Sequence, residues 1–143
     1  MAPAVVPFDC SYLSDMSSIA RARAALTQFA TAAGVVGDKL DDVRLCVSEA
    51  VSNAVLHAYA HSDRGSVRVG AVASGGELLI HVSDDGCGLR RESPNPGLGF
   101  GVPLMYRLCD GLVVRERALG GVEVHLRFDL LNVPVPTRSQ QGV

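Results

Sequence analysis

Three polar side chains recur at helical spacing between Ser48 and Ala58. Glu49, Asn53 and His57 stand at positions i, i+4 and i+8, so a helix places them on one face. Asparagine is a weak choice for an exposed helix interior, because its side chain competes for backbone hydrogen bonds. An amide oxygen can bind Mg²⁺ without adding negative charge, and a neighbouring carboxylate can accept a proton from a hydroxyl or a water. Glu49 and Asn53 therefore suit a phosphate site, and a polar face that meets only solvent is the alternative.

A second group of candidates follows directly after an apolar, strand-like segment. The residues from Asp84 to Gly88 read Asp-Asp-Gly-Cys-Gly, which puts a carboxylate at the strand end and two glycines behind it. Such a carboxylate can accept a hydrogen bond from the exocyclic amine of a base, and the glycines let backbone pass close to a flat ring. Asp84 and Asp85 are both candidates, and the spacing to Gly86 and Gly88 favours Asp84. An ordinary Asp-Gly turn is the alternative.

The third motif is a glycine-rich run just before a predicted helix. The residues from Gly97 to Gly101 read Gly-Leu-Gly-Phe-Gly, and unpaired backbone N–H groups at the start of a helix bind phosphate oxygens. The spacing matches neither the Walker A motif nor the dinucleotide-binding fingerprint, and a hinge loop is the alternative. Arg90 and Arg91 lie between the two glycine motifs, where they could reach phosphates or stay solvated.

Apolar periodicity predicts the elements that must position these motifs. Ser14 or Ser17 can cap a first helix and Asp38 a second, and the region from Asp84 to Gly101 holds too many glycines and prolines for regular structure. The order of elements predicts an α/β (α+β) two-layer sandwich, with a mixed and mostly antiparallel sheet and about three helices on one face. The predicted helices are Ser14–Gly34, Asp38–Ala60 and Val102–Cys109, and the predicted strands are Val5–Tyr12, Ser66–Ala73, Glu77–Ser83, Gly111–Arg117 and Val122–Leu130.

Composition bounds the class of protein. The 143 residues are 48% hydrophobic and 20% charged, with a formal net charge of -2. These values predict one globular domain without a general basic field for nucleic acid. No apolar run approaches the roughly 20 residues of a membrane span, so we expect no membrane partner. The four cysteines lack zinc-site spacing and no signal-peptide pattern is present, so we expect free thiols and a cytoplasmic location.

Together and in this order, the three motifs resemble those of the Bergerat-fold ATPases, a superfamily of gyrase-type topoisomerases, histidine kinases and anti-sigma factor serine kinases. The resemblance extends from about Phe8 to Phe128, and the Ser48–Tyr59 segment is most similar to the bacterial anti-sigma serine/threonine kinases. It implies a histidine kinase-like ATPase domain over residues 1–133 and a flexible C-terminal tail over residues 134–143.

The resemblance also implies ATP and Mg²⁺ as cofactors and assigns roles to the candidate residues. Glu49 would be the catalytic general base, Asn53 the Mg²⁺ ligand and Asp84 the acceptor for the adenine amine. The other implied nucleotide-binding residues line the base pocket or form the hinge of the ATP lid, and they are Gly86, Gly88, Gly97, Gly99, Phe100 and Gly101.

The resemblance also implies protein partners. The substrate would be a small anti-sigma antagonist protein, the chain could also sequester a sigma factor, and it could form a homodimer. Arg21 falls where such kinases can contact their sigma partner. Two departures stand out: the lid between Gly88 and Gly97 is short, and Gly121-Val122 stands where relatives carry Gly-Thr. The short lid favours a module that binds ATP without phosphoryl transfer. The alternatives are therefore a non-catalytic, ATP-dependent binding module, a detached histidine-kinase catalytic domain, and a fold that binds no nucleotide.

Overall fold

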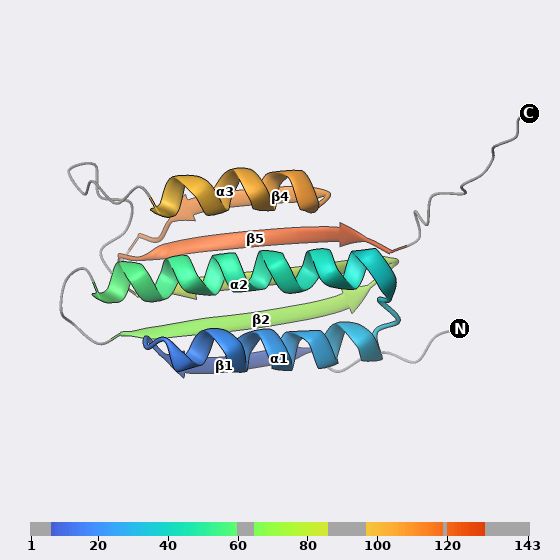
Figure 1. Ribbon diagram of the computed structural model, residues 1–143, viewed down its shortest axis with the longest axis horizontal. Helices are drawn as coiled ribbons and strands as arrows, with labels where there is room; N and C mark the ends of the chain where they lie inside the picture. The colour runs from blue at the N-terminus through green and yellow to red at the C-terminus, as the bar shows by residue number, and fades with distance from the viewer. Residues whose placement is uncertain (1–6, 60–64, 86–96, 119, 131–143) are drawn as a thin grey trace, which may run out of the picture.

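The computed structural model describes residues 7–59, 65–85, 97–118 and 120–130. They form two layers, with three helices on one face of a five-stranded sheet (Figure 1). The strands lie in the order β1-β2-β3-β5-β4, and every neighbouring pair is antiparallel. The predicted α+β sandwich is confirmed, and its sheet contains only antiparallel pairs among the described strands. The elements are β1 (Phe8–Leu13), α1 (Ser17–Ala32), α2 (Gly37–Tyr59), β2 (Ser66–Ser74), β3 (Glu77–Asp84), α3 (Gly97–Leu108), β4 (Gly111–Glu116) and β5 (Val122–Asp129).

The core lies between the helices and the inner face of the sheet. Helix α2 presents a stripe of valines at four-residue spacing, and all are fully buried. Strand β5 alternates, so that every second side chain packs inward and the residues between them face the uncovered side. Burying a valine or leucine side chain stabilises the fold by about 1.5–3 kcal/mol, which makes this interface the main support of the site. The buried residues of these two stripes are Val43, Val47, Val51, Val55, Val122, Val124, Leu126 and Phe128.

The ends of α1 and α2 differ from the predicted caps. No side chain caps α1 from its N-cap position, and Asp15 accepts hydrogen bonds from the backbone N of Ser18 at 3.3 Å and from Ser17 Oγ at 2.5 Å. The prediction of a cap by Ser14 or Ser17 is therefore wrong, because a carboxylate just ahead of the helix reaches its first turn. Helix α2 begins at Gly37, whose φ is 63°, so Asp38 lies in the first turn rather than at the N-cap. A negative charge there still favours the helix.

Helix α3 begins earlier than the sequence predicts. The glycine-rich run Gly97–Gly101 forms its first turns, so the predicted loop ends before Gly97. Each glycine costs the helix about 1 kcal/mol relative to alanine, and Pro103 removes one internal hydrogen bond. Packing of α3 against α2 and β4 offsets these costs. Tertiary contact, rather than local propensity, therefore decides where this helix starts.

One end of the sandwich gathers the segments that carry the motifs. The C-terminal end of α2, the end of β3, the start of α3 and the β4–β5 turn all lie there (Figure 1). None of the helices within the described residues has the length and apolar character to cross a membrane. The predicted tail, residues 134–143, falls outside the described part of the chain.

Candidate functional site

Two polar side chains are buried between α2 and the sheet. Asn53 is 7% exposed on α2, and Asp84, the last residue of β3, is 4% exposed. Asp84 stands opposite the fully buried Val67 of β2, so alternation along the strands points both side chains toward the helices. A carboxylate and a carboxamide are costly to bury without polar partners, which makes this a place built for polar contact.

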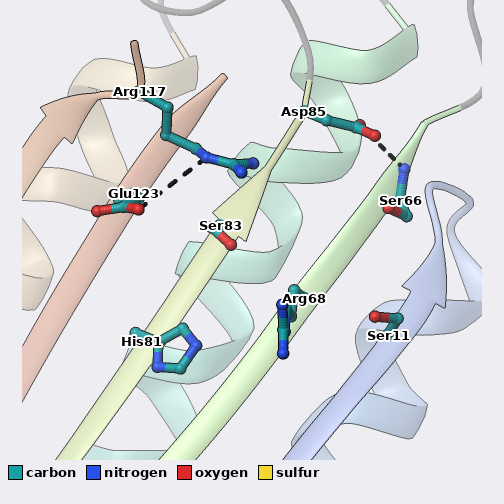
Figure 2. A pocket seen from close by; sticks show the side chains of 8 residues that line it. All are labelled: Ser11, Ser66, Arg68, His81, Ser83, Asp85, Arg117 and Glu123. Atoms are coloured by element: carbon teal, nitrogen blue, oxygen red, sulfur yellow. Dashed lines mark hydrogen bonds and ion pairs between the residues drawn. The ribbon is translucent and has the colours of Figure 1, made fainter. Parts of the chain in front are cut away.

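The two neighbouring aspartates at the end of β3 point to different sides of the sheet. Asp85 is exposed, and its Oδ1 accepts a hydrogen bond from the backbone N of Ser66 at 3.1 Å (Figure 2). That bond ties the end of β3 to the start of β2. Asp85 is therefore occupied outside the helix–sheet interface, and Asp84 supplies the buried carboxylate.

Glu49 lies one helical turn before Asn53 on α2, a rise of about 6 Å. Its side chain is half-buried, so it borders the buried site and still meets solvent. Its neighbour Ser48 is held apart from the site, since Ser48 Oγ donates to the carbonyl of Arg44 at 2.8 Å and accepts from Arg23 at 3.4 Å. The side chain of His57, the third member of the predicted row, lies outside the described residues.

The glycine motifs are only partly described. Gly86 and Gly88, with Arg90 and Arg91, belong to residues 86–96, which lie outside the described residues, and the same holds for the side chain of Phe100. The backbone of Gly97–Gly101 forms the start of α3. The first four N–H groups of a helix have no partner within it, and they carry the positive end of the helix dipole. This helix start can therefore hold an anion at the end of the sandwich where α2 ends.

The β4–β5 turn adds Arg117, which the motifs did not reveal, and shows how Gly121 packs. Arg117 Nη1 donates a hydrogen bond to the backbone carbonyl of Asp84 at 3.0 Å. Gly121 packs so closely that a Cβ there would lie 1.9 Å from the same carbonyl oxygen. In the sequence, the signal for this contact was only a basic residue ahead of a Gly-Gly turn. The contact between Arg117 and Asp84 depends on the position of β5 between β3 and β4.

The uncovered face of the sheet has a separate polar hollow of about 360 Å³ (Figure 2). Arg68 forms two hydrogen bonds to Asp9, at 3.0 and 2.7 Å. Glu123 shares a hydrogen bond with His125, which, with the nearby cations Arg115 and Arg117, holds the pKa of Glu123 below its usual range. The hollow therefore balances its own charges and lacks a net field for a triphosphate. Its lining residues are Ser11, Ser66, Arg68, His81, Ser83, Asp85, Arg117 and Glu123.

The helix side thus offers the chemistry that a bound nucleotide and cation need. A buried carboxylate can accept a hydrogen bond from a base, an amide oxygen can hold a hard cation, and a helix start can hold phosphate oxygens. Among the described residues, no group of three or more His, Cys, Asp or Glu side chains gathers as a metal site. Asn53 is the described buried side chain whose amide oxygen suits Mg²⁺.

Comparisons with known proteins agree with this architecture. Residues 13–128 match the family model of the histidine kinase-like ATPase domain. An anti-sigma F factor of Clostridium botulinum (strain Eklund 17B / Type B) is 28% identical over 136 residues, covering 85% of this chain and 94% of that protein. An anti-sigma F factor of Clostridium acetobutylicum is 31% identical over 117 residues, covering 81% of each chain.

A solved structure shares the fold. The crystal structure of the RsbU and RsbW domains of Rv1364c from Mycobacterium tuberculosis superposes with a TM-score of 0.66 at 20% identity. The match covers 87% of this chain and 32% of that longer chain, so this chain spans about a third of it. At this identity the likeness concerns the fold alone.

Proposed function

We propose a protein kinase function for this chain, which belongs to the histidine kinase-like ATPase family and, within it, to the anti-sigma F factors. It binds ATP with Mg²⁺ and phosphorylates a serine or threonine of a small antagonist protein. It also sequesters a sigma factor, in line with the anti-sigma name of its relatives, and so acts in the cytoplasm. The observation that carries the proposal is the burial of both Asn53, on α2, and Asp84, at the end of β3.

In this proposal Asp84 recognises the base. Its carboxylate accepts a hydrogen bond from the adenine amine, and the low dielectric of the buried position strengthens that bond. Gly86 and Gly88 line the base pocket, because backbone without side chains can approach a flat ring. The hydrogen bond from the backbone of Ser66 to Asp85 supports the choice of Asp84 over its neighbour.

The phosphates are held from α2 and α3. Asn53 presents its amide oxygen to Mg²⁺, and the cation supplies charge neutralisation of the triphosphate. The backbone N–H groups of Gly97, Gly99 and Gly101, at the start of α3, donate to phosphate oxygens, with Phe100 between them as part of the lid hinge. Glycine suits these positions because the backbone stays accessible.

Glu49 acts on the attacking hydroxyl. It lies one turn from Asn53 and keeps contact with solvent, so a protein substrate can bring a hydroxyl to its carboxylate. The carboxylate orients that hydroxyl or accepts its proton. Phosphoryl transfer depends on positioning and charge neutralisation more than on covalent help from the protein, so one well-placed carboxylate is sufficient.

The test separates binding from transfer with Glu49→Ala. ATP binding is measured by calorimetry in Mg²⁺, and transfer is measured with γ-labelled ATP and the small antagonist protein as acceptor. We expect Glu49→Ala to keep ATP binding and to lose transfer by at least about 100-fold. Asp41→Ala removes an exposed acid from the first turns of α2 and should leave both unchanged. Transfer by Glu49→Ala at the wild-type rate would exclude the general-base role.

A second function is favoured by the short lid. The segment expected to form the lid, between Gly88 and Gly97, is short and contains Pro94 and Pro96, and water exclusion from a γ-phosphate often depends on lid closure. The chain would then be an ATP-dependent regulatory module that binds its partners without catalysis. Wild-type protein that binds ATP and its partner, yet transfers no label, would establish this function.

The homodimer stays a prediction, and the sedimentation of the full chain in solution would test it.

A further inference from the structure

The β4–β5 turn holds the backbone of the aspartate that reads the base. We propose that Arg117 is a positioning residue of the nucleotide site, which orients the Asp84 carboxylate by binding the Asp84 carbonyl. The inference rests on the proposed function, because it takes Asp84 as the acceptor for the adenine amine. It adds a residue that touches neither base nor phosphate.

The contact crosses one strand of the sheet. Arg117 directly follows β4, and β5 lies between β4 and β3, so the side chain extends over the start of β5 to reach the end of β3 (Figure 2). Nη1 of Arg117 is 3.0 Å from the carbonyl oxygen of Asp84, and Nε lies 4.0 Å from Glu123 Oε2. The backbone N of Arg117 also donates to the carbonyl of Gly121 at 2.9 Å, which closes the turn. Arg117 is therefore held both at its backbone and at its guanidinium.

The Asp84 carbonyl lies just beyond the last pair between β3 and β5. The pairing of β3 with β5 ends at Ser83 opposite Glu123, one residue before Asp84. Arg117 provides a donor just beyond that point. A hydrogen bond from a charged guanidinium is roughly twice as strong as one between neutral groups, so it adds to the pairing of Asp84 with Val67 on the other side of β3.

Gly121 makes room for this arrangement. Its φ is 95°, and an added Cβ would lie 1.9 Å from the Asp84 carbonyl oxygen and 3.0 Å from Asp85 Cα. Turn backbone thus packs directly on the Asp84 peptide, while Arg117 binds the same oxygen. Two features of one turn restrict rotation of that peptide, and the peptide helps to fix the direction of the Cα–Cβ bond that carries the Asp84 carboxylate.

The consequence is selectivity for the base. A fixed carboxylate accepts a hydrogen bond from the amine of adenine, whereas guanine presents a carbonyl oxygen at that position and is repelled. We expect loss of the Arg117 contact to loosen the Asp84 peptide, so that both the attraction for ATP and the repulsion of GTP weaken. A purely structural role of Arg117 would lower stability, and with it the binding of both nucleotides together.

The chain offers a matched control. Arg115 lies two residues earlier, and its Nε is 3.4 Å from Glu123 Oε1. Arg115→Ala therefore removes the same charge beside the same carboxylate without touching Asp84. Arg117→Lys keeps the charge and a donor, and should restore part of the function if the bond to the carbonyl matters.

The experiment measures the affinity of the full chain for ATP and for GTP in Mg²⁺ by calorimetry, together with urea unfolding. We expect Arg117→Ala to weaken ATP binding by about tenfold or more and to lower the ATP-to-GTP preference, while Arg115→Ala stays within about twofold of wild type and Arg117→Lys lies between. Equal affinities in Arg117→Ala and Arg115→Ala, or an equal loss for both nucleotides, would overturn the positioning role while the proposed function stands. Wild-type protein that binds no ATP would overturn both.

Discussion

We expect Gly121→Ala to weaken ATP binding by more than its loss of unfolding free energy alone would explain. The added Cβ would lie 1.9 Å from the Asp84 carbonyl oxygen, whereas real Cβ contacts essentially never fall below 3.0 Å. The turn and the end of β3 must therefore separate by about 1.1 Å. That movement stretches the 3.0 Å hydrogen bond from Arg117 and displaces the peptide that carries the Asp84 carboxylate.

Gly34→Ala separates the backbone cost from the clash. Gly34 has a φ of 98°, close to the 95° of Gly121, and a Cβ there would meet nothing within 4 Å. Both variants should lose about 1–3 kcal/mol of unfolding free energy, because L side chains disfavour this backbone conformation. Gly121→Ala should lose about 1.5–3 kcal/mol more, the worth of a hydrogen bond to a charged group. The connection between α1 and α2, which contains Gly34, lies at the other end of the sandwich (Figure 1).

The assay pairs urea unfolding with calorimetric titration of ATP and Mg²⁺. A displacement of about 1 Å takes a hydrogen bond out of its useful range, so the ATP dissociation constant of Gly121→Ala should rise by about tenfold or more. Gly34→Ala should bind ATP within about twofold of wild type. Equal ATP affinity in the two variants would refute the reasoning, because the clash with Asp84 would then have no effect on the site.

Two further predictions concern titratable groups away from the nucleotide. Burial and the neighbouring His125, whose ring centroid lies 6.0 Å away, lower the pKa of His81 from its ordinary 6.5. The unfolded chain therefore takes up a proton first, and unfolding free energy falls as pH drops through 6.5 toward the lower pKa of the folded state. His81→Gln should lose less stability than wild type between about pH 7.5 and 5.5 in urea titrations, and an equal loss would contradict the assignment. Burial also raises the pKa of the Cys46 thiol to about 12, so this thiol should not react in the native protein. Cys46→Ala should therefore leave the number of reactive thiols per chain unchanged in native protein and lower it by about one in urea. A lower number in the native variant would show that the Cys46 thiol is reactive in the fold.

Local sequence patterns predicted several features of the fold. Residues four apart on α2 share a face of any helix, so the valine stripe and the row of Glu49 and Asn53 followed from spacing alone. The pairs Gly75-Gly76 and Gly120-Gly121 do adopt positive φ at the hairpin turns, because few other residues tolerate that backbone. These features depend on chemistry within a few residues, which is why the sequence sufficed for them.

Other features required the folded chain. Gly97–Gly101 is helical because α3 packs on α2, although its local propensity opposes a helix. The difference in burial between the side chains of Asp84 and Asp85 depends on which face of the sheet the helices cover. The contact of Arg117 with Asp84 joins residues that are distant in the chain, and it exists because β5 inserts between β3 and β4.

The sequence by itself thus determined the residue types of the site, the helical row of Glu49 and Asn53, and the order of the elements. Spacing already favoured Asp84 over Asp85, and tertiary structure decided that the Asp84 carboxylate is buried and that Arg117 binds the Asp84 backbone. The physical reason is that periodicity acts over one or two turns of chain, whereas strand order and helix packing bring together groups that no local pattern relates.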